Sequence, residues 1–200
     1  MRKIVSFVHL SLDGFVASVD GGLDWVSITE ELFDYVGQRI AATDTALYGR
    51  KTFQMMEAYW PTAADKPNPT AHEIEHSRWY KNTTKIVLSK PLQTENHSNI
   101  KIISSNLSDA ITKLKQTLGS EILVFGSPSA THALMAANLI DEYWLFINPV
   151  LLGQGIPFFR NIQDRTKLTL LKSKIFASGV VCLHYQVHHV VLTAEENQHG

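Results

Sequence analysis

The sequence predicts an α/β fold in which a central, mostly parallel β-sheet is flanked by helices, and three observations lead to this class. Short runs rich in β-branched and aromatic residues alternate with segments whose apolar residues recur at helical spacing. Helices that alternate with strands in this way are typical of a parallel sheet covered on both faces. The last two apolar runs are separated only by Ala177-Ser178-Gly179, which indicates an antiparallel hairpin at one edge of the sheet.

The first half of the chain begins with an apolar run that ends at the turn signal Asp13-Gly14. Its helix over 29–42 is indicated by Leu32, Phe33, Val36 and Ile40, which recur at helical spacing. The predicted elements are a strand over 4–10, a glycine-rich loop over 18–25, the helix over 29–42, a strand over 45–49, a helix over 50–60 and a Pro-rich loop with one short helix over 61–82.

The second half repeats the alternation of strand and helix. Ser108 is the expected N-cap of one helix, and Gly119 stands just past its end. The predicted elements are strands over 85–89 and 100–104, a helix over 108–118, a strand over 121–126, a helix over 127–138, a strand over 142–152, and the closing strands over 168–175 and 180–188.

Length and composition describe an ordinary globular protein, with 200 residues, 44% apolar residues and a net charge of −1. We expect one domain over 1–188 and a polar tail over 189–200. The absence of a basic excess argues against nucleic acid as a partner, and no apolar run reaches the roughly 20 residues that cross a bilayer. The single cysteine, Cys182, and an N-terminus without a signal-peptide pattern favour a cytoplasmic location.

Two places in the chain have the order strand, glycine, helix, which favours anion binding. A helix N-terminus presents unpaired N–H groups, and a glycine before it lets a phosphate approach the backbone. Neither place matches the usual dinucleotide or nucleoside-triphosphate glycine pattern. The residues are Gly49, Arg50, Lys51 and Thr52 in the first turn, and Gly126, Ser127, Pro128 and Ser129 in the second.

A third candidate element is Ser89-Lys90, directly after the strand over 85–89. A hydroxyl and a cation at a strand end could hold a further phosphate, such as the 2′-phosphate of NADPH. Two helix N-termini with this pair beside them favour a ligand that contains a pyrophosphate.

One motif points to a different chemistry. The segment from His72 to His76 matches H-E-x-x-H, in which two histidines one helical turn apart bind zinc and the glutamate acts as a base. A third ligand is missing, because Glu95 and His97 lie in a polar stretch without helical periodicity. We therefore predict no metal site, and we interpret the segment as a solvated helix face.

Six motifs in order resemble the dihydrofolate reductase superfamily, and most closely its branch that includes the riboflavin-biosynthesis reductase domain. They are SLDGFVA (11–17), DGGLDW (20–25), LYGRKTF (47–53) with the trailing YWP, KIVLSK (85–90), ILVFGSPS (122–129) and LIDEYWLFINPVLLGQGIPFF (139–159). The resemblance covers the chain from Ile4 to about Val187, and it implies a dihydrofolate-reductase-like fold, NADPH as the cofactor and a homodimer.

The resemblance also implies roles for individual residues. Val16 and Ala17 would contact the nicotinamide, and residues 18–25 would form a loop over it. The first turn would hold the pyrophosphate and the 2′-phosphate region, Ser89 with Lys90 the 2′-phosphate, and the second turn the nicotinamide side of the pyrophosphate. Dihydrofolate reductases have a Gly-Gly pair with a cis peptide bond where this chain has Gly126-Ser127, so a cis bond is expected there.

Three residues are candidates for the catalytic acid or base. The superfamily places a carboxylate on its first helix, where this chain offers Glu31, with Glu30 and Asp34 as alternatives. Asp13 is a second candidate, although Asp-Gly is also ordinary turn chemistry. His9 is the third, since the superfamily directs this strand position to the substrate pocket and histidine exchanges protons near neutral pH.

The expected function is reduction of a small heterocycle at the expense of NADPH. Either a riboflavin-pathway pyrimidine, as for a 5-amino-6-(5-phosphoribosylamino)uracil reductase, or a pterin, as for dihydrofolate reductase, would fit the resemblance. Two other classes stay open: a nucleotide-binding module without turnover, and the zinc metalloprotease that the H-E-x-x-H segment suggests.

Overall fold

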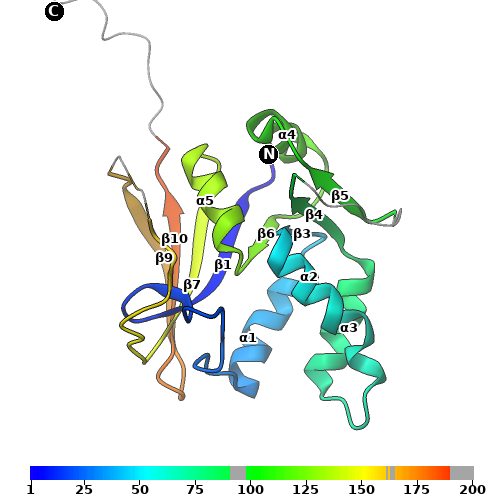
Figure 1. The fold of residues 1–200 in the computed structure, drawn as a ribbon, viewed down its shortest axis with the longest axis vertical. Coiled ribbons are helices and arrows are strands. Elements are labelled where there is room, and N and C mark those ends of the chain that lie inside the picture. Colours follow the sequence, from blue (N-terminus) through cyan, green and yellow to red (C-terminus); the bar gives the residue numbers. More distant parts are fainter. Residues whose placement is uncertain (91–97, 161, 163–164, 190–200) are drawn as a thin grey trace, which may run out of the picture.

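The computed structural model describes residues 1–90, 98–160, 162 and 165–189. Within this part of the chain, eight strands form one sheet in the order β5-β4-β3-β6-β1-β7-β10-β9, with every pair from β5 to β7 parallel and the last two pairs antiparallel (Figure 1). The strands are β1 (Ile4–Ser11), β3 (Thr45–Gly49), β4 (Thr84–Leu88), β5 (Ile100–Ile103), β6 (Ile122–Phe125), β7 (Glu142–Asn148), β9 (Leu168–Ile175) and β10 (Val181–Val187). The predicted parallel sheet with an antiparallel C-terminal hairpin at its edge is therefore confirmed.

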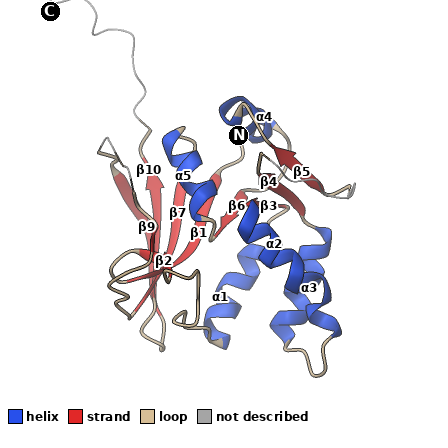
Figure 2. Ribbon diagram, in the orientation of Figure 1, coloured by secondary structure: helices blue, strands red, loops and turns tan. Residues whose placement is uncertain are grey.

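Helices cover both faces of the sheet (Figure 2). They are α1 (Glu30–Ala41), α2 (Arg50–Tyr59), the 3₁₀ helix η1 (Trp60–Asp65), α3 (Ala71–Asn82), α4 (Leu107–Gln116) and α5 (Pro128–Ala136). A small second sheet pairs β2 (Phe15–Ala17) with β8 (Ile156–Pro157). Within the described residues, none of the helices combines the length and the apolar character that a membrane span requires.

The core follows from the period of two along each strand. In β1, Ile4, Val8 and Leu10 pack on the α4–α5 side, whereas Val5 and Phe7 pack on the side of α1, α2 and α3. Because both faces of a parallel sheet are buried in this way, its strands read as nearly continuous apolar runs.

The structure corrects several predicted boundaries. The segment predicted as a Pro-rich loop with a short helix contains the full helix α3, which Thr70 and Glu73 close with a reciprocal capping box. Asn106, in the left-handed region at φ 48°, precedes α4, so Ser108 lies inside the helix and is not its N-cap. The strand predicted over 142–152 ends at Asn148, because Pro149 has no N–H with which to continue the ladder.

The domain limits stay a prediction. Residues 190–200 of the expected polar tail, together with Glu95 and His97 from the discussion of the zinc motif, lie outside the described residues.

Candidate functional site

The three predicted phosphate-binding elements lie at the carboxyl ends of three adjacent strands, β4, β3 and β6. Gly49, the last residue of β3, pairs with Leu88 of β4, and Leu47 pairs with Val124 of β6. The turns after β4, β3 and β6 therefore follow one another at the usual strand spacing of about 4.8 Å. Carboxyl ends of parallel strands are where open α/β sheets bind their ligands.

Gly49 and the start of α5 are in direct contact. The Gly49 N–H donates a hydrogen bond to Ser127 Oγ at 2.9 Å, and a Cβ on Gly49 would lie 2.6 Å from that oxygen and 2.7 Å from Ser129 Oγ. Only glycine permits this close approach, so the two predicted turns lie directly against each other and form one continuous cradle.

The N-termini of α2 and α5 are not capped by any described side chain. Gly49 is the N-cap of α2 and has no side chain, and the Ser127 hydroxyl, at the N-cap of α5, is turned toward Gly49 instead of its own helix. Pro128 occupies the first turn of α5 as predicted. The first N–H groups of both helices are thus available to an anion.

A buried polar atom lies at the third element. Among the described residues, Ser89 Oγ is buried and has no hydrogen-bond partner. A buried hydroxyl without a partner costs roughly 1–3 kcal/mol, and at this position a ligand that accepts its hydrogen bond would remove that cost. Lys90, Arg50 and Lys51 are exposed around this edge, and Thr52 is half-buried. These residues suit the anionic groups of a nucleotide cofactor.

The expected cis peptide bond between Gly126 and Ser127 is wrong for this structure, which contains no cis bond among the described residues. Gly126 instead takes φ 46°, a left-handed value that glycine adopts without strain. A trans bond after a left-handed glycine is enough to direct Ser127 toward Gly49.

Val16 and Ala17, predicted to contact the nicotinamide, are buried in β2. β2 pairs with β8, and His132 of α5 donates from Nε2 to the carbonyl of Phe158, directly after β8, at 2.7 Å. A Cβ on Gly155 would lie 2.5 Å from the Ala17 carbonyl oxygen, so only glycine allows the segment before β8 to approach β2 this closely. β2 is thereby fastened to α5, whose N-terminus belongs to the cradle.

Asp13 is exposed and holds the turn before β8. Its carboxylate accepts hydrogen bonds from the N–H groups of Leu152 and Gly153, the latter at 2.7 Å. Hydrogen bonds from the Ser11 hydroxyl and from these backbone groups lower the pKa of Asp13. The carboxylate is therefore ionised at neutral pH and engaged with the backbone.

Glu31 is directed to the C-terminal hairpin. It accepts a hydrogen bond from the Ala177 N–H at 3.2 Å and pairs with Lys174 at 3.2 Å. These interactions, the Ala177 bond first, lower the pKa of Glu31. Of its alternatives on the same helix, Glu30 and Asp34 are both exposed.

His9 lies on the α1 side of β1 and is half-buried. Its ring stacks on Phe146 with centroids 5.0 Å apart, and its Nδ1 is 3.4 Å from Nδ2 of Asn148. Burial lowers the pKa of His9 to about 4. At neutral pH the ring is therefore uncharged.

Comparison with known families decides where this architecture belongs. Residues 2–182 match the family described as the RibD C-terminal domain. The chain belongs to this family. The RibD C-terminal match thus spans the sheet, the cradle and most of the closing hairpin, and it agrees with the resemblance to the riboflavin branch of the superfamily.

Individual relatives agree with the RibD C-terminal assignment. An uncharacterised protein of Bacillus subtilis (strain 168), YyaP, is 31% identical over 187 residues, which cover 92% of this chain and 94% of the relative. A putative riboflavin biosynthesis protein from Shewanella sp. PV-4 has a similar fold, with a TM-score of 0.70, 22% identity, and coverage of 94% of this chain and all of that one. Dihydrofolate reductase from Enterococcus faecalis, in complex with NADP(H), gives a TM-score of 0.62 at 13% identity, covering 94% of this chain and 97% of that one. The dihydrofolate-reductase-like fold is confirmed.

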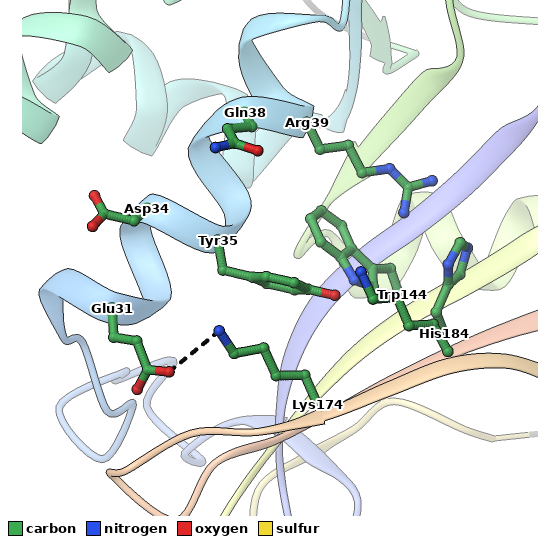
Figure 3. Close-up of a pocket in the computed structure, with 9 residues that line it drawn as sticks. Glu31, Asp34, Tyr35, Gln38, Arg39, Trp144, Lys174 and His184 are labelled. Atoms are coloured by element: carbon green, nitrogen blue, oxygen red, sulfur yellow. Dashed lines mark ion pairs between the residues drawn. The ribbon is translucent and has the colours of Figure 1, made fainter.

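A cavity of about 640 Å³ lies away from the cradle, between α1 and the strands β7, β10 and β9 (Figure 3). Of the charged side chains that line it, Glu31 forms an ion pair with Lys174. Arg39 forms a bidentate ion pair with Glu121, which lies outside the lining. Figure 3 shows Tyr35 and Arg39 projecting from α1 toward Trp144 and His184, and Glu31 pairing with Lys174, whereas Asp34 points away from these strand residues. None of the predicted cofactor-binding residues lines this cavity, so it is separate from the cradle.

The H-E-x-x-H segment lies on α3, but the interpretation as a solvated helix face is wrong. His76 is buried, with its ring 4.0 Å from that of Trp60, and His72 stacks on Phe33 at 3.6 Å. Within the described residues no group of three or more His, Cys, Asp or Glu side chains is arranged to hold a metal ion. The two histidines serve as aromatic packing partners that join α3 to α1, through Phe33, and to η1, through Trp60.

Sequence reasoning missed three residues that lie around the candidate site: Asn148, Ser27 and His132. Asn148 is fully buried, accepts from the Ser27 N–H at 2.9 Å and reaches His9. Its only signal in the sequence is an amide placed between an apolar strand and Pro149.

Proposed function

We propose that this chain is an NADPH-dependent reductase of a small heterocyclic substrate, either a pyrimidine of the riboflavin pathway or a pterin. Its membership of the RibD C-terminal domain family and its reductase-type fold support this class. The finer alternatives are a 5-amino-6-(5-phosphoribosylamino)uracil reductase and a dihydrofolate reductase.

The observation that carries the proposal is the cradle between Gly49 and Ser127. It combines two helix N-termini without side-chain caps, a close contact between Gly49 and Ser127 that only glycine permits and, one strand further along, the buried hydroxyl of Ser89. A pyrophosphate would accept hydrogen bonds from the helix N-termini, and a 2′-phosphate would be held by Ser89, Lys90 and Arg50.

When bound, the nicotinamide ring supplies a hydride to an electron-poor carbon of the substrate. The chain's own contribution would be position: Val16 and Ala17 of β2 would contact the ring, and the Phe158–His132 hydrogen bond fixes β2 relative to α5. Because Asp13 and Glu31 both have lowered pKa values, neither carboxylate carries a proton at neutral pH.

The test is NADPH oxidation, followed by loss of nicotinamide absorbance, with a panel of pyrimidine and pterin substrates. Turnover with one member supports the proposal and names the substrate. Saturable NADPH binding without turnover across the panel would favour a nucleotide-binding module. Failure to bind NADPH at all would overturn the cofactor assignment.

We further propose that the protein acts in the cytoplasm as a homodimer. β9 is an edge strand, and Leu170, Leu171 and Ile175 are exposed along it. An exposed apolar edge strand is a ready surface for pairing with a second copy.

A further inference from the structure

The orientation of the Asn148 side chain follows from its neighbours. Its Oδ1 accepts a hydrogen bond from the Ser27 N–H at 2.9 Å, and its Nδ2 faces the carbonyl oxygens of Leu10 at 3.2 Å and Phe146 at 3.1 Å. An N–H can only donate and a carbonyl can only accept. The reversed amide would place oxygen against two carbonyls, so only one orientation is compatible with the site.

This orientation determines which nitrogen of His9 carries the proton. The Asn148 amino group, which donates to the carbonyls of Leu10 and Phe146, also lies 3.4 Å from His9 Nδ1. Facing a donor, Nδ1 must present its lone pair, so the single proton of the neutral ring is on Nε2. An imidazolium would put a second N–H against the amino group, which disfavours the charged form.

The surroundings hold the ring in place. His9 stacks on Phe146 and meets Phe7 edge-on, with centroids 6.1 Å apart. Both aromatic rings are packed with others on the α1 side of the sheet, including Trp144. The donor on Nε2 is thus fixed by packing on one side and by Asn148 on the other.

We propose that His9 is a neutral hydrogen-bond donor to the substrate atom that gains negative charge during reduction, and that Asn148 is the positioning residue that keeps its proton on Nε2. The inference rests on the reductase function proposed above, and it gives His9 a different part from that of a general acid. His9 retains its proton throughout, and the hydrogen bond strengthens as charge develops on the carbonyl or imine heteroatom.

The tautomer is measured directly on the wild-type chain without cofactor. Protein labelled with ¹⁵N-histidine is studied by long-range ¹H–¹⁵N correlation at pH 7, and the His9 signals are assigned by their loss in His9→Gln. The expected result is a protonated Nε2 and a bare Nδ1. A proton on Nδ1, or a charged ring, would overturn the inference.

Two variants separate the roles of the pair. In Asn148→Asp the new carboxylate accepts from Nδ1–H, so the tautomer should reverse and the pKa of His9 should rise. An unchanged tautomer in folded Asn148→Asp would overturn the positioning role of Asn148. Because the wild-type spectrum decides the tautomer on its own, the test survives if this variant does not fold.

Kinetics then test the contact with substrate. His9→Leu should lower kcat about tenfold to hundredfold, the loss that corresponds to one hydrogen bond to a charged group. His9→Gln, which retains an N–H at the same reach, should recover most of it, and NADPH affinity should be unchanged in both. His188→Leu, exposed after β10, is the matched control.

The outcomes are distinguishable. Absence of turnover in the wild type overturns the proposed function and with it the role toward substrate, whereas the tautomer is decided by the spectrum. Normal turnover in His9→Leu overturns the hydrogen-bond role alone.

Discussion

The N–H of Gly49 donates a hydrogen bond to the hydroxyl of Ser127 at 2.9 Å. The last residue of β3 is therefore in direct contact with the N-cap of α5. In Gly49→Ala the added methyl would lie 2.6 Å from Ser127 Oγ and 2.7 Å from Ser129 Oγ. Overpacking of this kind costs about 1–3 kcal/mol. We expect denaturant unfolding to show that loss and NADPH titration to show weakened binding.

Gly37→Ala is the matched control for that experiment. Gly37 lies inside α1, and a Cβ built on it meets nothing within 4 Å. The replacement should raise the free energy of unfolding by about 0.5–1 kcal/mol through helix propensity and leave NADPH binding unchanged. Equal behaviour of the two variants would show that a side chain at position 49 does not collide with the hydroxyls of Ser127 and Ser129.

Arg50 tests the identity of the cofactor. It is exposed in the first turn of α2, where a 2′-phosphate would add a charge-assisted hydrogen bond worth about 1.5–3 kcal/mol. Arg50→Ala should therefore weaken NADPH by about tenfold to hundredfold, in the lower half of that range at physiological salt, and leave NADH almost unchanged. Fluorescence titration of both cofactors measures it, with Lys113→Ala on α4 as the control. Equal losses for NADPH and NADH would contradict the 2′-phosphate assignment.

Glu142 makes stability depend on pH. Burial alone would raise its pKa, but hydrogen bonds from His184 at 2.6 Å and Lys3 at 2.5 Å lower it to about 2. A lowered carboxyl pKa stabilises the fold above the unfolded value of 4.5, and this contribution disappears as the pH falls toward 2. We expect wild type to lose up to about 3 kcal/mol over that interval relative to Glu142→Gln. Urea unfolding at a series of pH values measures the difference, and exposed Glu75→Gln should follow the wild type.

We expect the histidine pair on α3, His72 and His76, to bind no metal ion. Purified protein should contain no stoichiometric zinc, because His72 and His76 are engaged with Phe33 and Trp60. Elemental analysis after purification without chelator is the measurement. One zinc per chain, lost together with function in His72→Ala, would show this prediction wrong.

The dimer is tested at β9. Leu171→Lys places a charge on the exposed face of the edge strand and should convert a dimer to a monomer in analytical ultracentrifugation. Leu118→Lys, at a fully exposed leucine before β6, should leave the mass unchanged. A wild type that sediments as a monomer, or a Leu171→Lys dimer, would contradict the proposed pairing.

Periodicity predicted most of the fold, because strand and helix faces in this chain carry clear apolar patterns. The helix over 29–42 and the strand over 168–175 agree closely with α1 and β9. α3 was underestimated because its interior is polar and aromatic, so that burial of His76 and Tyr80 depends on contacts with distant segments. Such tertiary contacts leave no local periodicity.

The site was partly predictable for a similar reason. Turn chemistry located Gly49 and Gly126, since glycine before a helix N-terminus is a local signal. The hydrogen bond from Gly49 to Ser127 joins residues far apart in the sequence, and so does the contact between His9 and Asn148. Neither pairing could be inferred without the order of strands in the sheet.

The hydrogen bond from the Ser27 N–H to Asn148 links the segment between the predicted nicotinamide loop (18–25) and α1 to the interior. If the segment that precedes α1 moved outward, the buried oxygen of Asn148 would lose the partner it has at 2.9 Å. An unpaired buried oxygen costs about 1–3 kcal/mol, which corresponds to a closed population roughly fivefold to 150-fold larger than the open one. The rate at which product leaves would then depend on how often this one bond breaks, and a mutation at Asn148 would alter the kinetics of opening as well as the chemistry at His9.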